Sequence, residues 1–251
     1  MEIYLYGRHT VRELLLKDPK RVLVLYLAQS AEPEFRPLAQ RMNVSVEPLP
    51  KNQFMRNLEG AVHQGVVAQV SMHKLVHEYK DFVNSLEPTP QTALVLLNEI
   101  TDPHNVGAIV RSAAAFGASG VLLPAHNQSP ITGVVAKTSA GMVFSVPIVS
   151  INNENQTIID LKKRGFWIYG LETDGATPLS HEKFNAPTVF VVGSEGPGLR
   201  EKTREHCDVL LKIPMHPRCE SLNASVSAAV VLSEWSTQHP EALVGAQTEA
   251  K

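Results

Sequence analysis

The segment "ALVLLNEITDPHNVGAIVRSAAAFGASGVLLP", residues 93–124, has the pattern of a strand, a helix and a second strand. Both outer runs are apolar without alternation, which is typical of strands buried on both faces of a parallel sheet. The runs 166–171, 188–192 and 208–214 have the same character, and helical patterns separate them. This alternation predicts an α/β fold in which a mostly parallel sheet carries helices on both faces.

The rest of the 251-residue chain predicts a second, smaller domain. Helical patterns around Thr10–Lys17 and Glu34–Met42 alternate with strand patterns that begin near Arg21 and Gln64. A polar stretch with two prolines follows, as in a linker. The expected organisation is a small α/β domain, a linker, a larger α/β domain and a flexible tail, at residues 1–71, 72–91, 92–240 and 241–251.

Composition limits the classes of protein and partner. The chain is 43% hydrophobic and 19% charged, which is typical of a globular protein. A formal net charge of -2 is not that of a general nucleic-acid binder, so any RNA contact would depend on local patches. With no apolar run of membrane-spanning length and no secretory leader pattern, we expect no membrane partner and a cytoplasmic location.

Two cysteines, Cys207 and Cys219, suggest free thiols in a reducing compartment. Together with His206 and His216 they could be drawn as a metal cluster, but the spacing lacks a typical ligand pair, so no metal is expected. In the apolar run 166–171, Trp167 and Tyr169 are expected to pack in the core.

Two loops that follow predicted strands carry unusual polar residues. In the first, Asn105 occupies the expected N-cap of an apolar helix that contains one cation, Arg111. A guanidinium buried there needs an anion, although pairing with a core carboxylate or a place at a domain edge explains it equally well. In the second, Glu195 lies among the glycines of 193–198, which would let backbone approach a ligand or simply form a solvated turn.

The third loop leads into an apolar helix at 223–238. Four polar residues alternate at its start, at Ser221, Asn223, Ser225 and Ser227, and one cap would explain only one of them. Because ligands of parallel α/β sheets bind at the carboxyl ends of the strands, we expect all three loops to face one crevice.

These motifs, in order, resemble the signatures of the SpoU (TrmH) family of SPOUT RNA 2′-O-ribose methyltransferases. They are "DPHNVGAIVRSA" (102–113), "VVGSEGPGL" (191–199) and "IPMHPRCESLNASVSAA" (213–229), with the connector "AKTSAGMVFSVPI" (136–148) between the first two. The N-terminal "YGRHTVRELL" (6–15) is similar to the family's RNA-binding domain. This sequence departs from the family pattern in two places. The loop His216–Cys219 replaces a small-residue loop with Gly, and Ala224 replaces Val. Both departures bear on the substrate more than on the chemistry.

The resemblance implies a C-terminal trefoil knot, a homodimer and S-adenosyl-L-methionine as cofactor. The implied catalytic residues are Asn105, Arg111, Glu195, Ser221 and Asn223. The implied cofactor-binding residues are Leu171, Thr173, Gly193, Ile213 and Leu222, acting mainly through backbone and apolar atoms. Arg111 is the family's activating residue, and we expect it to lower the pKa of the ribose hydroxyl and to clamp the adjoining phosphate.

The expected function is 2′-O-ribose methylation of a guanosine in structured RNA, with 23S rRNA favoured over tRNA. The alternatives are a tRNA 2′-O-methyltransferase and a non-catalytic RNA-binding or ribosome-assembly factor, which would be expected to lose Arg111 or Asn223. From the residues alone, a doubly wound nucleotide-dependent enzyme is a further alternative, and the lack of a G-x-G-x-x-G or phosphate-loop lysine counts against it.

Overall fold

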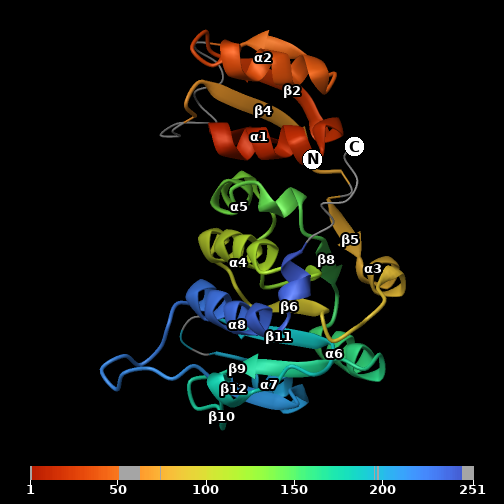
Figure 1. Cartoon of the computed structure of the whole chain (residues 1–251), viewed down its shortest axis with the longest axis vertical. Helices are drawn as coiled ribbons and strands as arrows, with labels where there is room; N and C mark the ends of the chain where they lie inside the picture. The colour runs from red at the N-terminus through yellow and green to blue at the C-terminus, as the bar shows by residue number, and fades with distance from the viewer. Residues whose placement is uncertain (1, 51–62, 74, 195, 197, 245–251) are drawn as a thin grey trace. The chain divides into compact units, whose positions relative to one another are not determined.

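The computed structural model describes residues 2–50, 63–73, 75–194, 196 and 198–244. Figure 1 shows the chain coloured from the N-terminus to the C-terminus. It divides into two compact units, of which the first comprises Met1–Leu75 and Ile131–Ser145. The second comprises Val76–Pro130 and Val146–Lys251.

The first unit has a four-stranded sheet in the order β1-β4-β2-β3. Its pairings are antiparallel except for β2 with β3. The buried side chains of Leu5, Leu14, Leu25 and Phe35 form part of its core. The elements are β1 (Glu2–Tyr6), α1 (Arg8–Lys17), β2 (Val22–Leu27), α2 (Glu32–Arg41), β3 (Val46–Pro48) and β4 (Val66–Ser71).

Residues 131–145 pack with this first unit although they lie far along the chain. They form α5 (Gly133–Thr138) and a 3-10 turn at Met142–Phe144. The ammonium group of Lys137 lies 4.6 Å from the ring centroid of Tyr6, and the backbone at Gly141 closely approaches Thr10. The sequence alone assigns this segment to the domain 92–240. It could not reveal the packing with the first unit, because contacts between residues so distant in sequence leave no local pattern.

The second unit is built on an eight-stranded sheet in the order β10-β12-β9-β11-β6-β7-β8-β5. Every pairing between its described strands is parallel, which confirms the predicted sheet. The central strand β6 is buried along its whole length, as its unbroken apolar run predicts. The strands are β5 (Val76–Glu78), β6 (Ala93–Asn98), β7 (Gly120–Pro124), β8 (Ile148–Ile151), β9 (Trp167–Leu171), β10 (Thr177–Pro178), β11 (Thr188–Gly193) and β12 (Val209–Lys212).

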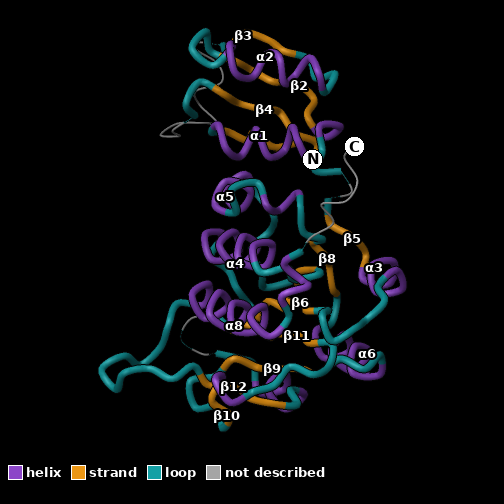
Figure 2. The backbone as a smooth tube through the Cα atoms, viewed as in Figure 1, coloured by secondary structure: helices purple, strands orange, loops and turns teal. Residues whose placement is uncertain are grey.

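Helices cover both faces of this sheet, as predicted (Figures 1 and 2). On one face, Phe82 of α3 and Ile158 of α6 join a core cluster with Leu94 and Leu96 of β6. On the other face, α4 packs against α8, and α8 contacts β11. The helices are α3 (Tyr79–Ser85), α4 (Pro103–Ala115), α6 (Glu154–Lys163), α7 (Glu201–His206) and α8 (Ala224–Gln238). Among the described residues, no helix is both long and apolar enough to cross a bilayer.

Two local features differ from the sequence analysis. Residues 76–85, placed there in the linker, form β5 and α3, because β5 pairs with β8 at the sheet edge and α3 buries Phe82. Trp167 is 50% exposed, so its predicted core position is wrong. Tyr169 is buried, with its ring against Phe184 and Phe190, whereas Trp167 begins the strand.

Candidate functional site

A cavity of about 560 Å³ lies at the carboxyl ends of β9, β11 and β12. Three segments form most of its lining: the loop after β9, the glycine-rich loop after β11, and residues between β12 and the first turn of α8. Arg204, on the helix α7, also lines it. These are strand ends of a parallel sheet, where ligand sites of this architecture occur. The five residues expected to hold a cofactor all lie in the lining, namely Leu171, Thr173, Gly193, Ile213 and Leu222.

The glycine-rich loop forms a tight reversal that side chains would obstruct. Ser194 forms an antiparallel bridge with Gly198, so the chain turns back directly after β11. A Cβ atom on Gly193 would lie 2.5 Å from the carbonyl carbon of Gly198, and Gly196 and Gly198 have φ of +92° and +69°. Glycine is therefore required here by both space and backbone conformation. Glu195 lies outside the described residues, and its expected role stays a prediction.

Charged side chains in the cavity lining were missed by the sequence analysis. The Glu172 carboxylate accepts a hydrogen bond of 2.9 Å from the Leu199 amide and so joins the loop after β9 to the glycine-rich loop. Asp174 pairs with Arg204 at 2.9 Å, and the hydrogen bond from that guanidinium lowers the pKa of Asp174. Two carboxylates and one guanidinium give the described lining a formal charge of -1. The run "ETD" (172–174) directly after a buried strand was the available signal.

The polar start of α8 serves two purposes. The Asn223 side-chain oxygen accepts hydrogen bonds from the backbone amides of Ser225, at 2.9 Å, and Val226, at 3.4 Å, so Asn223 is the N-cap. Ser221, Asn223 and Ser227 line the cavity, whereas Ser225 lines a separate groove and donates to Asn223 at 2.6 Å. Alternating polar residues therefore cap the helix and supply polar groups to one side of it.

The expected N-cap of α4 is wrong, because Asp102 takes that position. Its carboxylate accepts a hydrogen bond from the His104 amide at 2.9 Å. Pro103 occupies the first helical position, where the backbone N–H that proline lacks would have no partner within the helix. Asn105 therefore lies in the first turn and is buried. Its side-chain oxygen accepts a 2.9 Å hydrogen bond from Nδ2 of Asn223, so the structure joins two of the predicted catalytic residues.

Arg111 is exposed, so the predicted burial of its guanidinium is wrong. It shares the outer face of α4 with His104, Ala108 and Ala115. The alanines on this outer face made the helix appear apolar on all sides, although this face is not buried. Arg111 lies six positions after Asn105, about 9 Å along the helix axis, and does not line the cavity of its own chain. Among the described residues it has no ion-pair partner.

A shallow groove beside Arg111 runs between α4 and α8. Val226 and Val230, one turn apart on α8, are 45% and 37% exposed there. Small residues of both helices complete the floor, including Ala108, Ser112, Ala229 and Ser233. Helix α8 thus has apolar side chains on its exposed face as well as on the face that packs in its own unit.

The fold and the cavity define an α/β protein in which loops at the carboxyl ends of parallel strands surround a cavity. Residues 92–233 match the SpoU rRNA Methylase family. The chain belongs to this family, as its three motifs indicated. Residues 4–76 match the family described as RNA 2'-O ribose methyltransferase substrate binding.

Similar proteins cover nearly the whole chain. A 23S rRNA (guanosine-2'-O-)-methyltransferase RlmB of Neisseria meningitidis is 36% identical over 92% of this chain and 93% of its own length. The solved structure of a putative TrmH-family RNA methyltransferase from Porphyromonas gingivalis has a TM-score of 0.73 and 26% identity, covering 93% of this chain and 89% of that one. The SpoU methyltransferase AviRb from Streptomyces viridochromogenes, solved with AdoMet, has the same fold, with a TM-score of 0.78 and 23% identity over 96% of this chain and 91% of its own.

Proposed function

We propose that this protein transfers a methyl group from S-adenosyl-L-methionine to the ribose 2′-hydroxyl of a guanosine in 23S rRNA. The observation that carries the proposal is the cavity at the carboxyl ends of β9, β11 and β12, to which the second and third family motifs both contribute. The hydrogen bond from Asn223 to Asn105 connects the first motif to the third motif next to this cavity. The 36% identical relative named for this reaction supports the choice of rRNA and guanosine.

The cavity fits S-adenosyl-L-methionine in size, surface and charge. Its volume of about 560 Å³ is within the range of small-molecule sites. The ligand's sulfonium, ammonium and carboxylate sum to one positive charge, which complements the charge of -1 on the described lining. Leu171, Ile213 and Leu222 would contact the ligand through apolar atoms and backbone, while Thr173 and Gly193 would present polar backbone groups.

The chain's own residues have to hold the ribose hydroxyl and make its oxygen more nucleophilic. When bound, S-adenosyl-L-methionine supplies a methyl group attached to a sulfonium centre. A guanidinium is a poor base, so Arg111 donates hydrogen bonds, lowering the pKa of the hydroxyl and clamping the neighbouring phosphate. Asn105 and Glu195 orient Arg111 and the ribose, and Ser221 and Asn223 form the polar edge of the cavity.

Because Arg111 does not line the cavity of its own chain, we propose that the active site forms across a homodimer. The groove between α4 and α8 supports this, since it is lined on α4 by Ala108 and Ser112, which are close to Arg111 on the same helix, and its exposed valines are suited to burial against a second copy. Each site then combines the cavity of one protomer with the guanidinium of the other. A two-fold axis would generate two such sites.

Mixing two inactive variants tests this arrangement. Arg111→Ala and Asn223→Ala are each expected to be inactive alone. After subunit exchange, the mixture should recover about one quarter of the wild-type rate, because about half of the dimers are mixed and each has one complete site out of two. A mixture no more active than the sum of its two components, with exchange verified by mass spectrometry, would contradict the shared site.

Two further features extend the proposal. We propose that residues between β12 and α8 pass through the loops after β9 and β11 as a trefoil knot, which is consistent with all three segments lining one cavity. The first unit holds the RNA substrate, in agreement with its match to the substrate-binding family. Its binding is expected to be salt-sensitive, because the chain as a whole is slightly acidic and local basic groups must contact phosphates.

The direct test uses labelled S-adenosyl-L-methionine with 23S rRNA transcripts and, separately, tRNA. We expect label in 23S rRNA, in an alkali-resistant dinucleotide that contains guanosine. Arg111→Lys should methylate poorly, because Lys lacks the planar fork of donors. Label only in tRNA would refute the substrate, and cofactor binding without transfer to either RNA would favour a non-catalytic RNA-binding or assembly role.

A further inference from the structure

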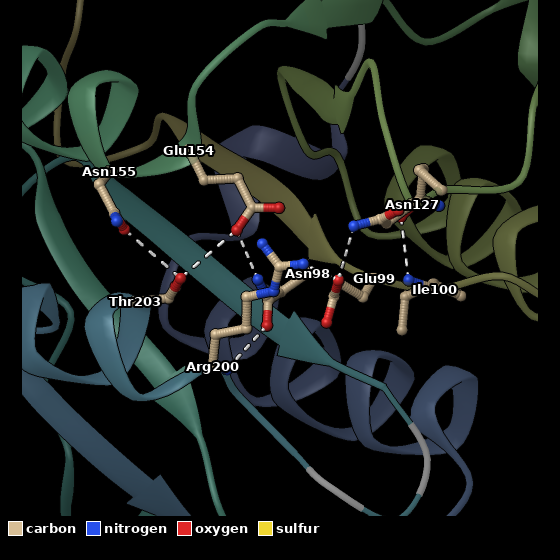
Figure 3. Close-up of polar contacts among 9 residues, drawn as sticks. Asn98, Glu99, Ile100, Asn127, Glu154, Asn155, Arg200 and Thr203 are labelled. Carbon is tan, nitrogen blue, oxygen red and sulfur yellow. Dashed lines mark hydrogen bonds and ion pairs between the residues drawn. The ribbon is translucent and has the colours of Figure 1, made fainter.

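A second polar cluster lies at the carboxyl end of β6, outside the cavity lining (Figure 3). We name Asn98, Glu99 and Arg200 the β6 clasp. Asn98 and Glu99 lie where β6 passes into the loop that leads to Asp102 and α4. Arg200 follows the glycine-rich loop and immediately precedes α7. The clasp therefore joins the residues just before the first motif (102–113) to the residue just after the second motif (191–199).

The buried member of the clasp, Asn98, has a fixed orientation. Its side chain is 0% exposed, its oxygen accepts a 3.0 Å hydrogen bond from the Arg200 amide, and its Nδ2 donates to Glu154 at the start of α6. With both ends of the amide engaged, rotation would break two hydrogen bonds in a buried place. Thr203 of α7 also donates to Glu154, at 3.4 Å, so this α6 carboxylate accepts from both β6 and α7.

The exposed part of the clasp is the ion pair between Glu99 and Arg200. Glu99 has a φ of +60°, a left-handed conformation that a non-glycine residue adopts at a cost in free energy. Its carboxylate accepts hydrogen bonds from the Arg200 guanidinium and, at 3.2 Å, from Nδ2 of Asn127. Figure 3 shows Glu99 between these two donors, which come from different loops.

Neighbouring backbone hydrogen bonds continue the same connection. The Ile100 amide donates to the side chain of Gln128 at 2.9 Å, and the Ile100 carbonyl accepts from the Ser129 amide at 3.0 Å. The first residues of the loop toward Asn105 are thereby fixed on both sides. Beyond the ladder between β6 and β11, Arg200 donates hydrogen bonds to Asn98 and Glu99 and so joins this stretch to the end of the glycine-rich loop.

We infer that the β6 clasp positions the loop bearing Asn105 and the glycine-rich loop relative to each other for methyl transfer. Its members are positioning residues, because none of them lines the cavity. The inference rests on the proposed methyltransferase function. Since the Arg200 and Glu99 side chains are 51% and 28% exposed, their ion pair should add little to the free energy of unfolding, so its role in catalysis can be separated from stability.

The test compares Arg200→Ala, Glu99→Gln and the double variant with Arg164→Ala. The control removes a guanidinium that is 35% exposed, against 51% for Arg200, and that pairs with Asp160 on α6 away from both loops. Each protein is measured for its melting temperature, its Kd for S-adenosyl-L-homocysteine by calorimetry, and its kcat and KM on the RNA.

For Arg200→Ala we expect kcat to fall at least about tenfold, because small displacements of reacting groups are costly in rate. Its melting temperature and the Kd should stay close to those of Arg164→Ala. The double variant should lose no more kcat than Arg200→Ala alone, because the two side chains act as one unit. Arg200→Lys should recover part of the rate by keeping a charged donor.

Two results would overturn the inference: an unchanged kcat for Arg200→Ala, or independent multiplicative losses from the two single variants. If the kcat is unchanged and the KM for RNA is higher, Arg200 is a phosphate contact instead. Failure of the proposed function is a separate outcome, because neither the wild type nor Arg164→Ala would then methylate RNA.

Discussion

Replacing Asn223 by Ala should destabilise α8 and its junction with α4. The substitution removes an N-cap that accepts from two backbone amides, and it removes the donor to Asn105. Loss of such a cap costs about 1 kcal/mol. Leaving the buried Asn105 without this hydrogen bond adds about 1–2 kcal/mol to the loss.

The sum of about 2–3 kcal/mol corresponds to a fall in melting temperature of roughly 5–10 °C for a unit of this size. Asn223→Asp keeps the capping oxygen and places a negative charge at the helix N-terminus, where it is favourable. It loses only the donor to Asn105, so we expect about half of the effect. Ser225→Ala, which removes one hydrogen bond to the same capping oxygen, serves as the control and should change the melting temperature least.

Tryptophan fluorescence can follow this helix directly. The chain has two Trp residues, of which Trp235 is fully buried on α8 and Trp167 is half-exposed on β9. In a Trp167→Phe background, Trp235 reports the melting of α8. If Asn223→Ala melts with the parent protein, or if Asn223→Asp falls as far as Asn223→Ala, the attribution to capping is wrong.

Three further predictions concern other parts of the second unit. Gly193→Ala should weaken S-adenosyl-L-homocysteine binding at least about tenfold in calorimetry, because its Cβ would overlap the Gly198 backbone; an unchanged Kd would contradict this. Burial raises the pKa of Glu154 above its ordinary 4.5, so the folded state binds the proton more tightly and loses stability as pH rises above that value. The melting temperature of Glu154→Gln, measured relative to that of the wild type, should therefore rise from pH 4 to pH 7. A fall over this range would contradict the raised pKa of Glu154. Burial also raises the pKa of Cys207 to about 12, so at pH 8 iodoacetamide should label exposed Cys219 rapidly and Cys207 slowly, and mass spectrometry showing two fast sites would refute this.

The sequence alone predicts the layered architecture of the second unit. Unbroken apolar runs predict five of its strands, β6, β7, β9, β11 and β12, each from a few consecutive residues. Because parallel strands end on the same edge, the sequence also indicates which loops share a crevice. Leu171, Gly193 and Ile213, which the resemblance to the family motifs implied, line this cavity.

Other local patterns are ambiguous without tertiary structure. Alanine fits both a buried and an exposed helix face, so the composition of α4 does not reveal that Arg111 faces outward. The run from Asp102 to Asn105 offers two capping residues, and only the helical position of Pro103 decides between them. The short polar strand β5 has no apolar periodicity of its own and exists because β8 provides a pairing edge.

Partnerships across the chain are decided by the tertiary structure alone. Asn105 and Asn223 are 118 positions apart, and Glu99 and Arg200 are 101 apart. Residues 131–145 pack with the first unit although the flanking strands belong to the second. A hydrogen bond or ion pair between distant residues constrains neither neighbourhood in the sequence, because its energy depends on a distance that exists only after the chain has folded. The sequence thus determined the main buried strands and the helices between them, while packing determined the edge strand β5, the burial of α4 and which polar groups meet at the strand ends.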